Sequence, residues 1–300
     1  MTTKPVDRVT VVVATRNRCQ DLLLTLPRHE SPVVLVDNGS TDGSPAVVRD
    51  RFAHVEVVEL GRNAGATARN VGVEQARTPY VAFADDDSWW ASGCLARAAE
   101  VLDACPDVAL LTARVLVGTE QQPDPVSVAM AEDLLGPDAS LPGPAVLGFL
   151  ACAAVVRREA FLQVGGFDDV IFFGGEEEML ALDLSSAGWQ MAYVDELTVH
   201  HHPSVSPDRR GRARLATRNH LLVTLMRRPW PVLADKTLRA AASGGPGVRA
   251  TLSALRRAPR AIARRRPLPE RVEEAKQRLE RRYRPVARRS AADGTYPPHG

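Results

Sequence analysis

The sequence predicts a doubly wound α/β domain followed by a basic helical extension, and three observations lead to this prediction. Short, Val-rich apolar runs alternate with helix-like segments over the first 117 residues, an order typical of parallel strands joined by helices. Most of these runs are continuous rather than alternating, as expected for strands buried on both faces. Basic residues are concentrated in the last third of the chain.

Five strands and four helices are expected in the first part of the chain. The strands are at residues 9–14, 33–36, 55–60, 80–84 and 108–117, and the helices at residues 20–26, 44–50, 64–76 and 92–104. In open α/β sheets, ligands bind at the carboxyl ends of the strands. We therefore expect the chemistry in the loops that follow the strands.

Residues 118–145 hold five prolines and predict an exposed loop or lid rather than core. Regular structure is expected to resume after them. The strands are at residues 151–156, 191–194 and 197–200, and the helices at residues 157–164 and 176–187. Gly188 is a suitable residue to end the second of these helices.

A different composition begins at residue 203. Helices are expected at residues 212–226, 236–242, 249–264 and 270–283, with Pro- and Gly-rich breaks between them. The sequence therefore predicts an α/β domain over residues 1–202, a basic helical extension over residues 203–289 and a disordered tail over residues 290–300.

Charge is divided unevenly along the chain. Residues 1–200 carry 14 Lys and Arg against 29 Asp and Glu, whereas residues 201–300 carry 24 against 7. An acidic body with a basic tail indicates two separate roles. Nucleic acid is not favoured as a partner, because the arginines of the tail are not interleaved with the aromatic side chains used in single-strand binding.

Neither a membrane span nor a secretion signal is expected. No apolar run reaches the roughly 20 residues that cross a bilayer, and the first eight residues are polar, unlike a signal peptide. The four cysteines are scattered, without the spacing of a metal finger or a disulfide framework. These features predict a cytoplasmic protein.

Three consecutive carboxylates, Asp85, Asp86 and Asp87, follow the predicted strand at residues 80–84. Their mutual repulsion is relieved if a divalent cation lies between them, and oxygen-rich sites of this kind suit Mg²⁺ or Mn²⁺. Such an ion would also stabilise a departing diphosphate. A solvated acidic turn that opens the next helix is the alternative.

Polar loops after two earlier strands are candidates for nucleotide binding. Asp37 ends a buried strand, where an acid can accept a hydrogen bond from a base or ribose, and Gly39 allows a tight turn against a ligand. An ordinary turn that caps the next helix is the alternative. The candidates in these two loops are Thr15, Arg16, Asn17, Asp37, Asn38 and Gly39.

The segment at residues 62–70 opens a helix and carries two arginines that could neutralise the charge of a phosphate group. It is neither a dinucleotide-binding glycine fingerprint nor a phosphate-binding P-loop. A surface helix with solvated arginines is the alternative. The candidates in this segment are Arg62, Asn63, Gly65, Arg69 and Asn70.

Two later clusters complete the candidate chemistry. Glu176 and Glu177 open a helix after two glycines; the helix dipole favours acids there, but they also suit an aimed general base. Three consecutive histidines follow a later strand. Alternation places His200 and His202 on one side and His201 on the other, and one of them could complete a metal site.

Together these motifs resemble the family 2 glycosyltransferases. The motifs, which span roughly the first 202 residues in the order of the family, are ATRNR (14–18), VLVDNGSTD (34–42), GRNAGATARNVG (61–72), VAFADDD (81–87), GGFDD (165–169), GGEEE (174–178) and VHHH (199–202). The resemblance implies a Rossmann-like GT-A fold, a nucleotide-sugar donor, and an enzyme that transfers the sugar with inversion at its anomeric carbon.

The resemblance also implies roles for individual residues. Asp37 would bond the base of the donor, Asp85 would contact the nucleotide, and Asp87 would bind the metal. The base would be Glu177, the second acid of its pair, with Glu176 before it.

Two positions depart from the usual pattern of the family, and at a third position two residues could match the same family residue. The family often has Glu-Asp where this chain has Glu176 and Glu177, and often an Arg where this chain has Asp183. The metal-binding histidine is either His200 or His201, together with Asp85 and Asp87.

Two other classes of protein share parts of this pattern. A nucleotidyltransferase has a similar core and a metal, but a glycine-rich loop would follow its first strand, where residues 14–18 of this chain hold no glycine. A sugar-nucleotide-binding relative without activity would keep the fold. The intact acidic motifs argue against it.

The basic extension carries apolar positions near one face of the helix at residues 249–264, including Leu252, Leu255 and Ile262, with arginines largely elsewhere. A basic amphipathic helix can lie on an anionic membrane. This would place the protein at the inner face of the plasma membrane and suit a glycan or glycolipid acceptor. Packing on the acidic body, or self-association, is the alternative.

Overall fold

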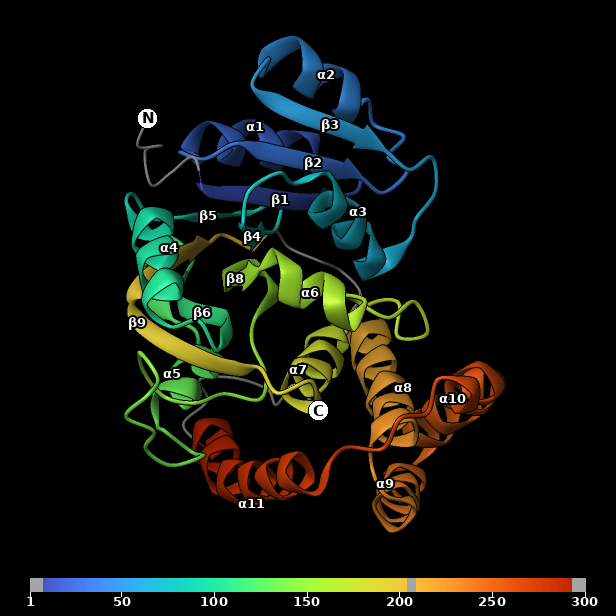
Figure 1. Cartoon of the computed structure of the whole chain (residues 1–300). Helices are drawn as coiled ribbons and strands as arrows, with labels where there is room; N and C mark the ends of the chain where they lie inside the picture. Colours follow the sequence, from blue (N-terminus) through green and yellow to red (C-terminus); the bar gives the residue numbers. More distant parts are fainter. Residues whose placement is uncertain (1–7, 204–208, 293–300) are drawn as a thin grey trace.

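A single curled sheet runs through the protein, with helices on both of its faces (Figure 1). The structure is a computed structural model that describes residues 8–203 and 209–292. The strand order is β3-β2-β1-β4-β8-β6-β9-β5, and β7 pairs with β6. The strands are β1 (Val9–Thr15), β2 (Val33–Asp37), β3 (Val55–Glu59), β4 (Tyr80–Ala84), β5 (Ser88–Trp90), β6 (Val108–Val117), β7 (Gln122–Pro123), β8 (Ala154–Arg157) and β9 (Gln190–His201).

The sheet is parallel in its first half and mixed in its second. Strands β1 to β4 are parallel to one another, as predicted, and β6 is parallel to β9. Strand β8 runs antiparallel between β4 and β6, and β5 runs antiparallel to β9. The apolar runs do not indicate direction, because a strand buried on both faces has the same composition either way.

One prediction about the later part of the sheet is wrong, and a second holds only in part. The two strands expected at residues 191–194 and 197–200 form one strand, β9, whose register with β6 shifts between Ala113 and Arg114. The exposed loop expected at residues 118–145 contains β7 and helix α5 (Pro125–Ala131). Asp124 caps that helix, accepting a hydrogen bond from the Val126 N–H at 2.8 Å, and Ala129 is buried.

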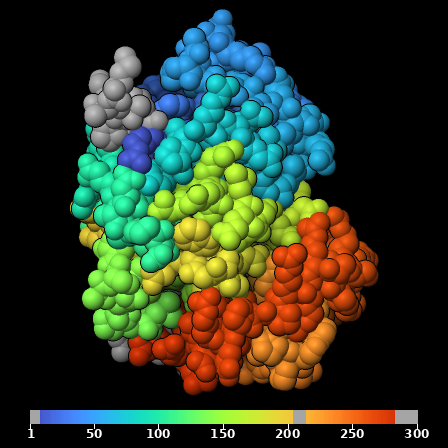
Figure 2. All heavy atoms as spheres, in the orientation of Figure 1, coloured from blue at the N-terminus to red at the C-terminus, as the bar shows by residue number. Residues whose placement is uncertain are grey.

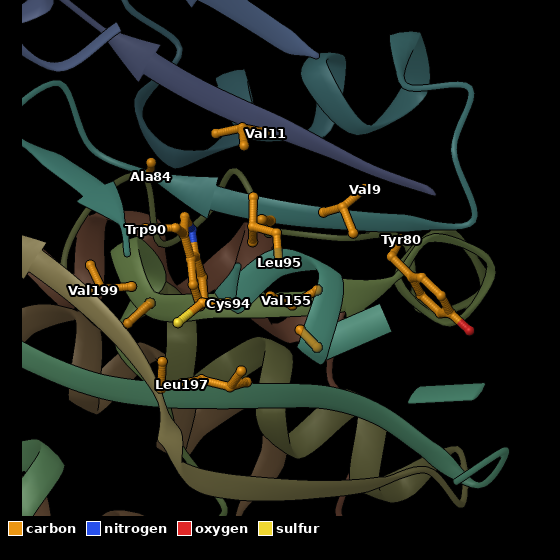
Figure 3. Close-up of a cluster of buried hydrophobic side chains, with 14 of the residues drawn as sticks. Val9, Val11, Tyr80, Ala84, Trp90, Cys94, Leu95, Val155, Leu197 and Val199 are labelled. Atoms are coloured by element: carbon orange, nitrogen blue, oxygen red, sulfur yellow. The ribbon is translucent and has the colours of Figure 1, made fainter. Parts of the chain in front are cut away.

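The helices of the α/β part lie close to their predicted positions. They are α1 (Cys19–Thr25), α2 (Ser44–Arg51), α3 (Ala68–Gln75), α4 (Cys94–Ala104), α6 (Arg158–Val164) and α7 (Glu176–Ser186). A core cluster packs α4 against the sheet, and Figure 3 shows part of it. Trp90 of β5 is buried in this cluster, and its indole N–H donates to the Phe83 carbonyl of β4 at 3.0 Å. The core therefore anchors both ends of the loop that carries Asp85, Asp86 and Asp87.

Four helices form the C-terminal part: α8 (Arg209–Arg227), α9 (Trp230–Ala242), α10 (Gly245–Ala263) and α11 (Glu270–Ala292). Figure 2 shows this part, in orange to red, lying against the α/β part. Residues 290–292 of the predicted tail are helical, and residues 293–300 lie outside the described residues. Among the described helices, none has the length and apolar composition needed to cross a bilayer.

Buried ion pairs join these helices to one another and to α7. Arg228, whose side chain is 2% exposed, pairs with Glu273 and Glu280 of α11. Lys276 of α11 lies 2.7 Å from Glu178 of α7. Because breaking a buried pair leaves an uncompensated charge, these contacts fix the position of the C-terminal helices on the helix that begins with Glu176.

Candidate active site

The candidate residues gather where the parallel strands end. Thr15 at the end of β1 and Asp37 at the end of β2 are register partners, and β4 on the other side of β1 leads into the loop of Asp85 to Asp87. The Thr15 hydroxyl donates to Asp86 at 2.9 Å. Burial, with the negative charges of Asp85 and Asp87, raises the pKa of Asp86 to about 7.

Two carboxylates and one imidazole lie together as a candidate metal site. Asp85, Asp87 and His201 each offer a ligand atom, and these atoms lie within 4.8 Å of one another. His201 Nε2 is 3.2 Å from Asp87 Oδ1. Burial lowers the pKa of His201, but its hydrogen bond to Asp87 and the nearby negative charges outweigh burial and raise it. Two oxygen ligands and one nitrogen ligand suit a divalent ion such as Mn²⁺.

The structure brings His201, and not His200, to the carboxylates. Strand β5 pairs with the end of β9, so that Ser88 opposes His201 and Trp89 opposes His200. The His200 ring stacks on the Trp89 indole, with 5.3 Å between centroids, and its Nδ1 contacts the side-chain oxygen of Gln121. The alternation expected for the three histidines is therefore present, and pairing with β5 decides which side faces the acids.

Arg69 lies buried between the two acidic clusters. Its Nη2 donates to Asp85 Oδ1 at 2.6 Å, and its Nη1 is 3.9 Å from Glu176 Oε1. The sequence predicts that this arginine binds a phosphate group, but in the structure its guanidinium contacts carboxylates of the protein. It links the metal-site acid to the acids that open α7.

The pair at the start of α7 lies in a poorly solvated position. Glu176 is 2% exposed, and burial raises its pKa despite the nearby Arg69. Burial and the negative charge of Glu176 raise the pKa of Glu177 to about 8. Among the described residues Glu177 has no ion-pair partner within 4 Å. A carboxylate with a raised pKa is suited to accept a proton near neutral pH.

The loop after β2 is organised mainly by its own hydrogen bonds. Asp37 accepts hydrogen bonds from the Gly39 and Ser40 N–H groups at 3.1 and 3.0 Å. The Asn38 amide bonds the Gly65 carbonyl and the Ala64 N–H. The structure thus gives Asn38 a bridging role between two loops of the site.

Two glycines of the predicted site permit close backbone contact. Gly39 has φ +77°, and a Cβ there would lie 2.9 Å from the Arg62 carbonyl carbon. Gly65 has φ +64°, and a Cβ there would lie 2.2 Å from the Phe172 carbonyl oxygen. Both positions therefore require glycine for packing within the protein.

The remaining candidates divide into exposed and internally bonded residues. Arg16 and Arg62 are exposed. Asn17 is also exposed, and its side chain accepts from the Thr41 N–H at 2.7 Å. Asn63 accepts from the Gly65 N–H, and Asn70 bonds both backbone groups of Phe167. Asn70 therefore holds the backbone at Phe167 in place.

Two residues of α8 contribute to the site without having been predicted. Asn219 donates to the carbonyls of Phe173 and Gly174, just before Glu176. Arg218 donates to the Ile171 carbonyl in the same loop. An Arg-Asn pair within a basic helix gives no local signal, because the contacts span about 45 residues of sequence.

Comparison with known proteins shows the family of the chain. The family model described as glycosyl transferase family 2 matches residues 10–165, more than half of the chain. The chain belongs to glycosyl transferase family 2.

The family 2 glycosyltransferase has two similar relatives in Mycobacterium tuberculosis. An N-acetylglucosaminyl-diphospho-decaprenol L-rhamnosyltransferase is 30% identical over 217 residues, which cover 61% of this chain and 70% of that protein. A pre-mycofactocin glycosyltransferase is 31% identical over 210 residues, which cover 65% of this chain and 43% of that protein.

The fold agrees with solved structures of GT-A type. A mannosyltransferase from Pyrobaculum calidifontis, in complex with GDP-Man and Mn²⁺, has a TM-score of 0.56 at 21% identity, covering 93% of this chain and 86% of that one. The predicted GT-A fold with a helical C-terminal part is confirmed, and so is the prediction that this protein is a glycosyltransferase.

One departure of this glycosyltransferase from its family has a structural counterpart. Asp183 occupies the helix position where the family often has Arg, and it pairs with Arg227 of α8 at 2.5 Å. The charge at this position therefore joins α7 to the C-terminal helices.

Proposed function

We propose that this enzyme moves a sugar from a nucleotide-diphosphate donor to an acceptor hydroxyl, with inversion and with the help of Mn²⁺ or Mg²⁺. The observation that carries the proposal is the linked pair of acidic clusters. Asp85, Asp87 and His201 gather at the ends of β4 and β9, and Arg69 joins them to Glu176. The leaving-group site and the acidic pair that includes the proposed general base would then lie on opposite sides of one buried arginine.

The residues divide the work of an inverting displacement. Asp85, Asp87 and His201 would hold the ion, which when bound would offset the charge of the leaving diphosphate. Glu177 would take the proton of the acceptor hydroxyl as that oxygen attacks the anomeric carbon. Glu176 would keep the proton affinity of Glu177 high through its negative charge.

The donor nucleotide would lie along the loops after β1 and β2. Asp37 is held by hydrogen bonds from its own loop, and the exposed Arg16 and Arg62 lie beside that loop at Gly39. We propose that Asp37 contacts the nucleotide base. The solved mannosyltransferase relative binds GDP-Man with Mn²⁺. We propose the same class of donor for this chain, a nucleotide-diphosphate sugar.

The acceptor is proposed to be a lipid-linked glycan of the cell envelope. The rhamnosyltransferase relative is named for a sugar carried on diphospho-decaprenol. We propose that residues 1–202 perform the transfer and that residues 203–289 position the acceptor.

Transfer itself tests the function. Purified protein, Mn²⁺, a panel of nucleotide sugars and a short-chain isoprenoid diphosphate that carries a sugar should give a product one sugar heavier in mass spectrometry. Release of a nucleoside diphosphate should match product formation. If nucleotide release does not depend on the acceptor with any donor of the panel, the proposal is contradicted.

The exposed face of α10 is proposed to lie on an anionic membrane. Val248, Leu252, Leu255 and Ile262 are each 43% to 61% exposed and recur at helical spacing. The opposite face, with Ala250, Ala254 and Ala261, is buried. Exposed arginines on the same helix complement anionic headgroups, each contributing about 1 kcal/mol at most.

Replacing Leu252 and Leu255 together by Gln is expected to abolish most vesicle binding. The wild type should sediment with vesicles of anionic phospholipid, less so at high salt, and not with neutral vesicles. Leu24→Gln is the control, because Leu24 is 65% exposed on α1, in the α/β part. Absence of wild-type binding at low salt, with a concentration-dependent increase in mass, would assign the face to self-association instead.

A further inference from the structure

The loop that precedes the acids of α7 is held by arginines from two C-terminal helices. Arg218 of α8 donates from Nη2 to the Ile171 carbonyl at 3.2 Å. Arg257 of α10 donates from Nη1 to the adjacent Val170 carbonyl at 2.6 Å. Two guanidinium groups thus contact the carbonyls of consecutive residues in the loop that leads to Glu176.

These arginines have no acidic partner within the described residues. Neither Arg218 nor Arg257 forms an ion pair there, and neither does Arg214, one turn earlier on α8. The acids of the same loop are already engaged, since Asp168 and Asp169 pair with Arg264 and Arg260. The local charge is therefore positive.

Burial makes this excess of positive charge energetically unfavourable. Arg218 is only 8% exposed. Burial and the positive charges of Arg257 and Arg214 lower its pKa to about 10. The carbonyls of the loop and the side-chain oxygen of Asn219 accept hydrogen bonds from the arginines but do not neutralise their charge. Buried charges are usually paired. An anion bound beside these three arginines would supply the missing charge.

We propose that Arg214, Arg218 and Arg257 form a subsite for a phosphate or diphosphate group of the acceptor. The inference rests on the proposed function, and it gives the C-terminal helices a chemical role in acceptor recognition. Arginine forks match phosphate oxygens in a bidentate manner, and Arg214 is exposed, so the cluster can be reached from solvent.

The position of the cluster fits an acceptor rather than the donor. The proposed site for the donor diphosphate is at Asp85, Asp87 and His201, whereas the arginines contact the loop that leads into Glu177, the proposed base. Arg257 lies on the side of α10 that packs on this loop, away from the exposed apolar residues of the same helix.

Arg214→Gln and Arg257→Gln are expected to raise KM for a diphosphate-linked acceptor about ten-fold each, through the loss of a charge-assisted contact. KM for the same sugar as a phosphate-free alkyl glycoside should stay within about two-fold, as should KM for the donor. Arg77→Gln, an exposed arginine before β4, is the matched control. An equal rise in KM for both acceptors, or no rise for either, would overturn the proposal.

A binding measurement separates this inference from the function it rests on. Inorganic pyrophosphate in excess EDTA should raise the melting temperature of the wild type and of Arg77→Gln, but not of Arg214→Gln or Arg257→Gln. This result does not depend on transfer. No shift of the wild type would refute the subsite even if transfer occurs. Loss of binding to anionic vesicles in Arg214→Gln, with unchanged KM for the acceptor, would assign the arginines to bilayer headgroups and also refute it.

Discussion

Glu177→Gln is expected to lower kcat by about 10²- to 10⁴-fold, the range that a positioned general base contributes, while KM for the donor stays within about two-fold. Glutamine keeps the shape of the side chain but cannot accept the proton of the acceptor hydroxyl. Steady-state kinetics with both substrates varied separates the two effects. Asp50→Asn, an exposed acid on α2, is the control.

The dependence of kcat on pH is a second test of the prediction that Glu177 is the general base. Burial and Glu176 raise the pKa of Glu177 to about 8, and the base works only when deprotonated. Activity should therefore rise with pH up to about 8 and level off above it. Glu176→Gln removes a negative neighbour and should move the rise to lower pH. If Glu176→Gln is the inactive variant instead, the two glutamates exchange roles.

Chelation of the divalent ion is expected to abolish transfer, with activity restored by Mn²⁺. Asp87→Asn should weaken Mn²⁺ binding and lower kcat/KM by about 10³-fold, because an ion that offsets leaving-group charge contributes several kcal/mol. His201→Ala should weaken Mn²⁺ binding as well. His200→Ala should leave it unchanged, because His200 contacts Trp89 and Gln121.

Direct titration of Mn²⁺, followed by electron paramagnetic resonance, checks these affinities apart from turnover. Full transfer in excess EDTA would contradict the metal assignment. Equal loss of Mn²⁺ affinity in His200→Ala and His201→Ala would show that the histidine cluster acts as a unit.

The parts of the site that lie on consecutive strand ends could be predicted from the sequence. Asp37 and Asp85 each follow a run of buried residues that is recognisable by composition. The order of strands in the parallel half brings their ends to one edge. For these residues, the local sequence pattern and the general topology of α/β sheets were sufficient to predict their place in the site.

Other features depend on pairing between distant segments and had no local signal. Strand β5 is three residues long and exists because it pairs with β9. That pairing turns His201 toward Asp87, a choice that alternation alone left open. The contact of Asn219 with the loop before Glu176 likewise depends on how α8 packs.

Burial also changed the interpretation of one predicted contact. Arg69 reads as a phosphate ligand in sequence because arginine in a helix-opening loop commonly has that role. In the structure small residues such as Gly72 bring α3 against the sheet, and the Arg69 guanidinium is buried between Asp85 and Glu176. Its charge offsets that of the acids on either side.

The anomeric configuration of the transfer product tests the central claim most directly. Proton NMR of the new glycosidic linkage, compared with the linkage in the nucleotide-sugar donor, reports whether the anomeric carbon is inverted. A single displacement with Glu177 as base predicts the opposite configuration to that of the donor. A product that retains the donor configuration would contradict the account.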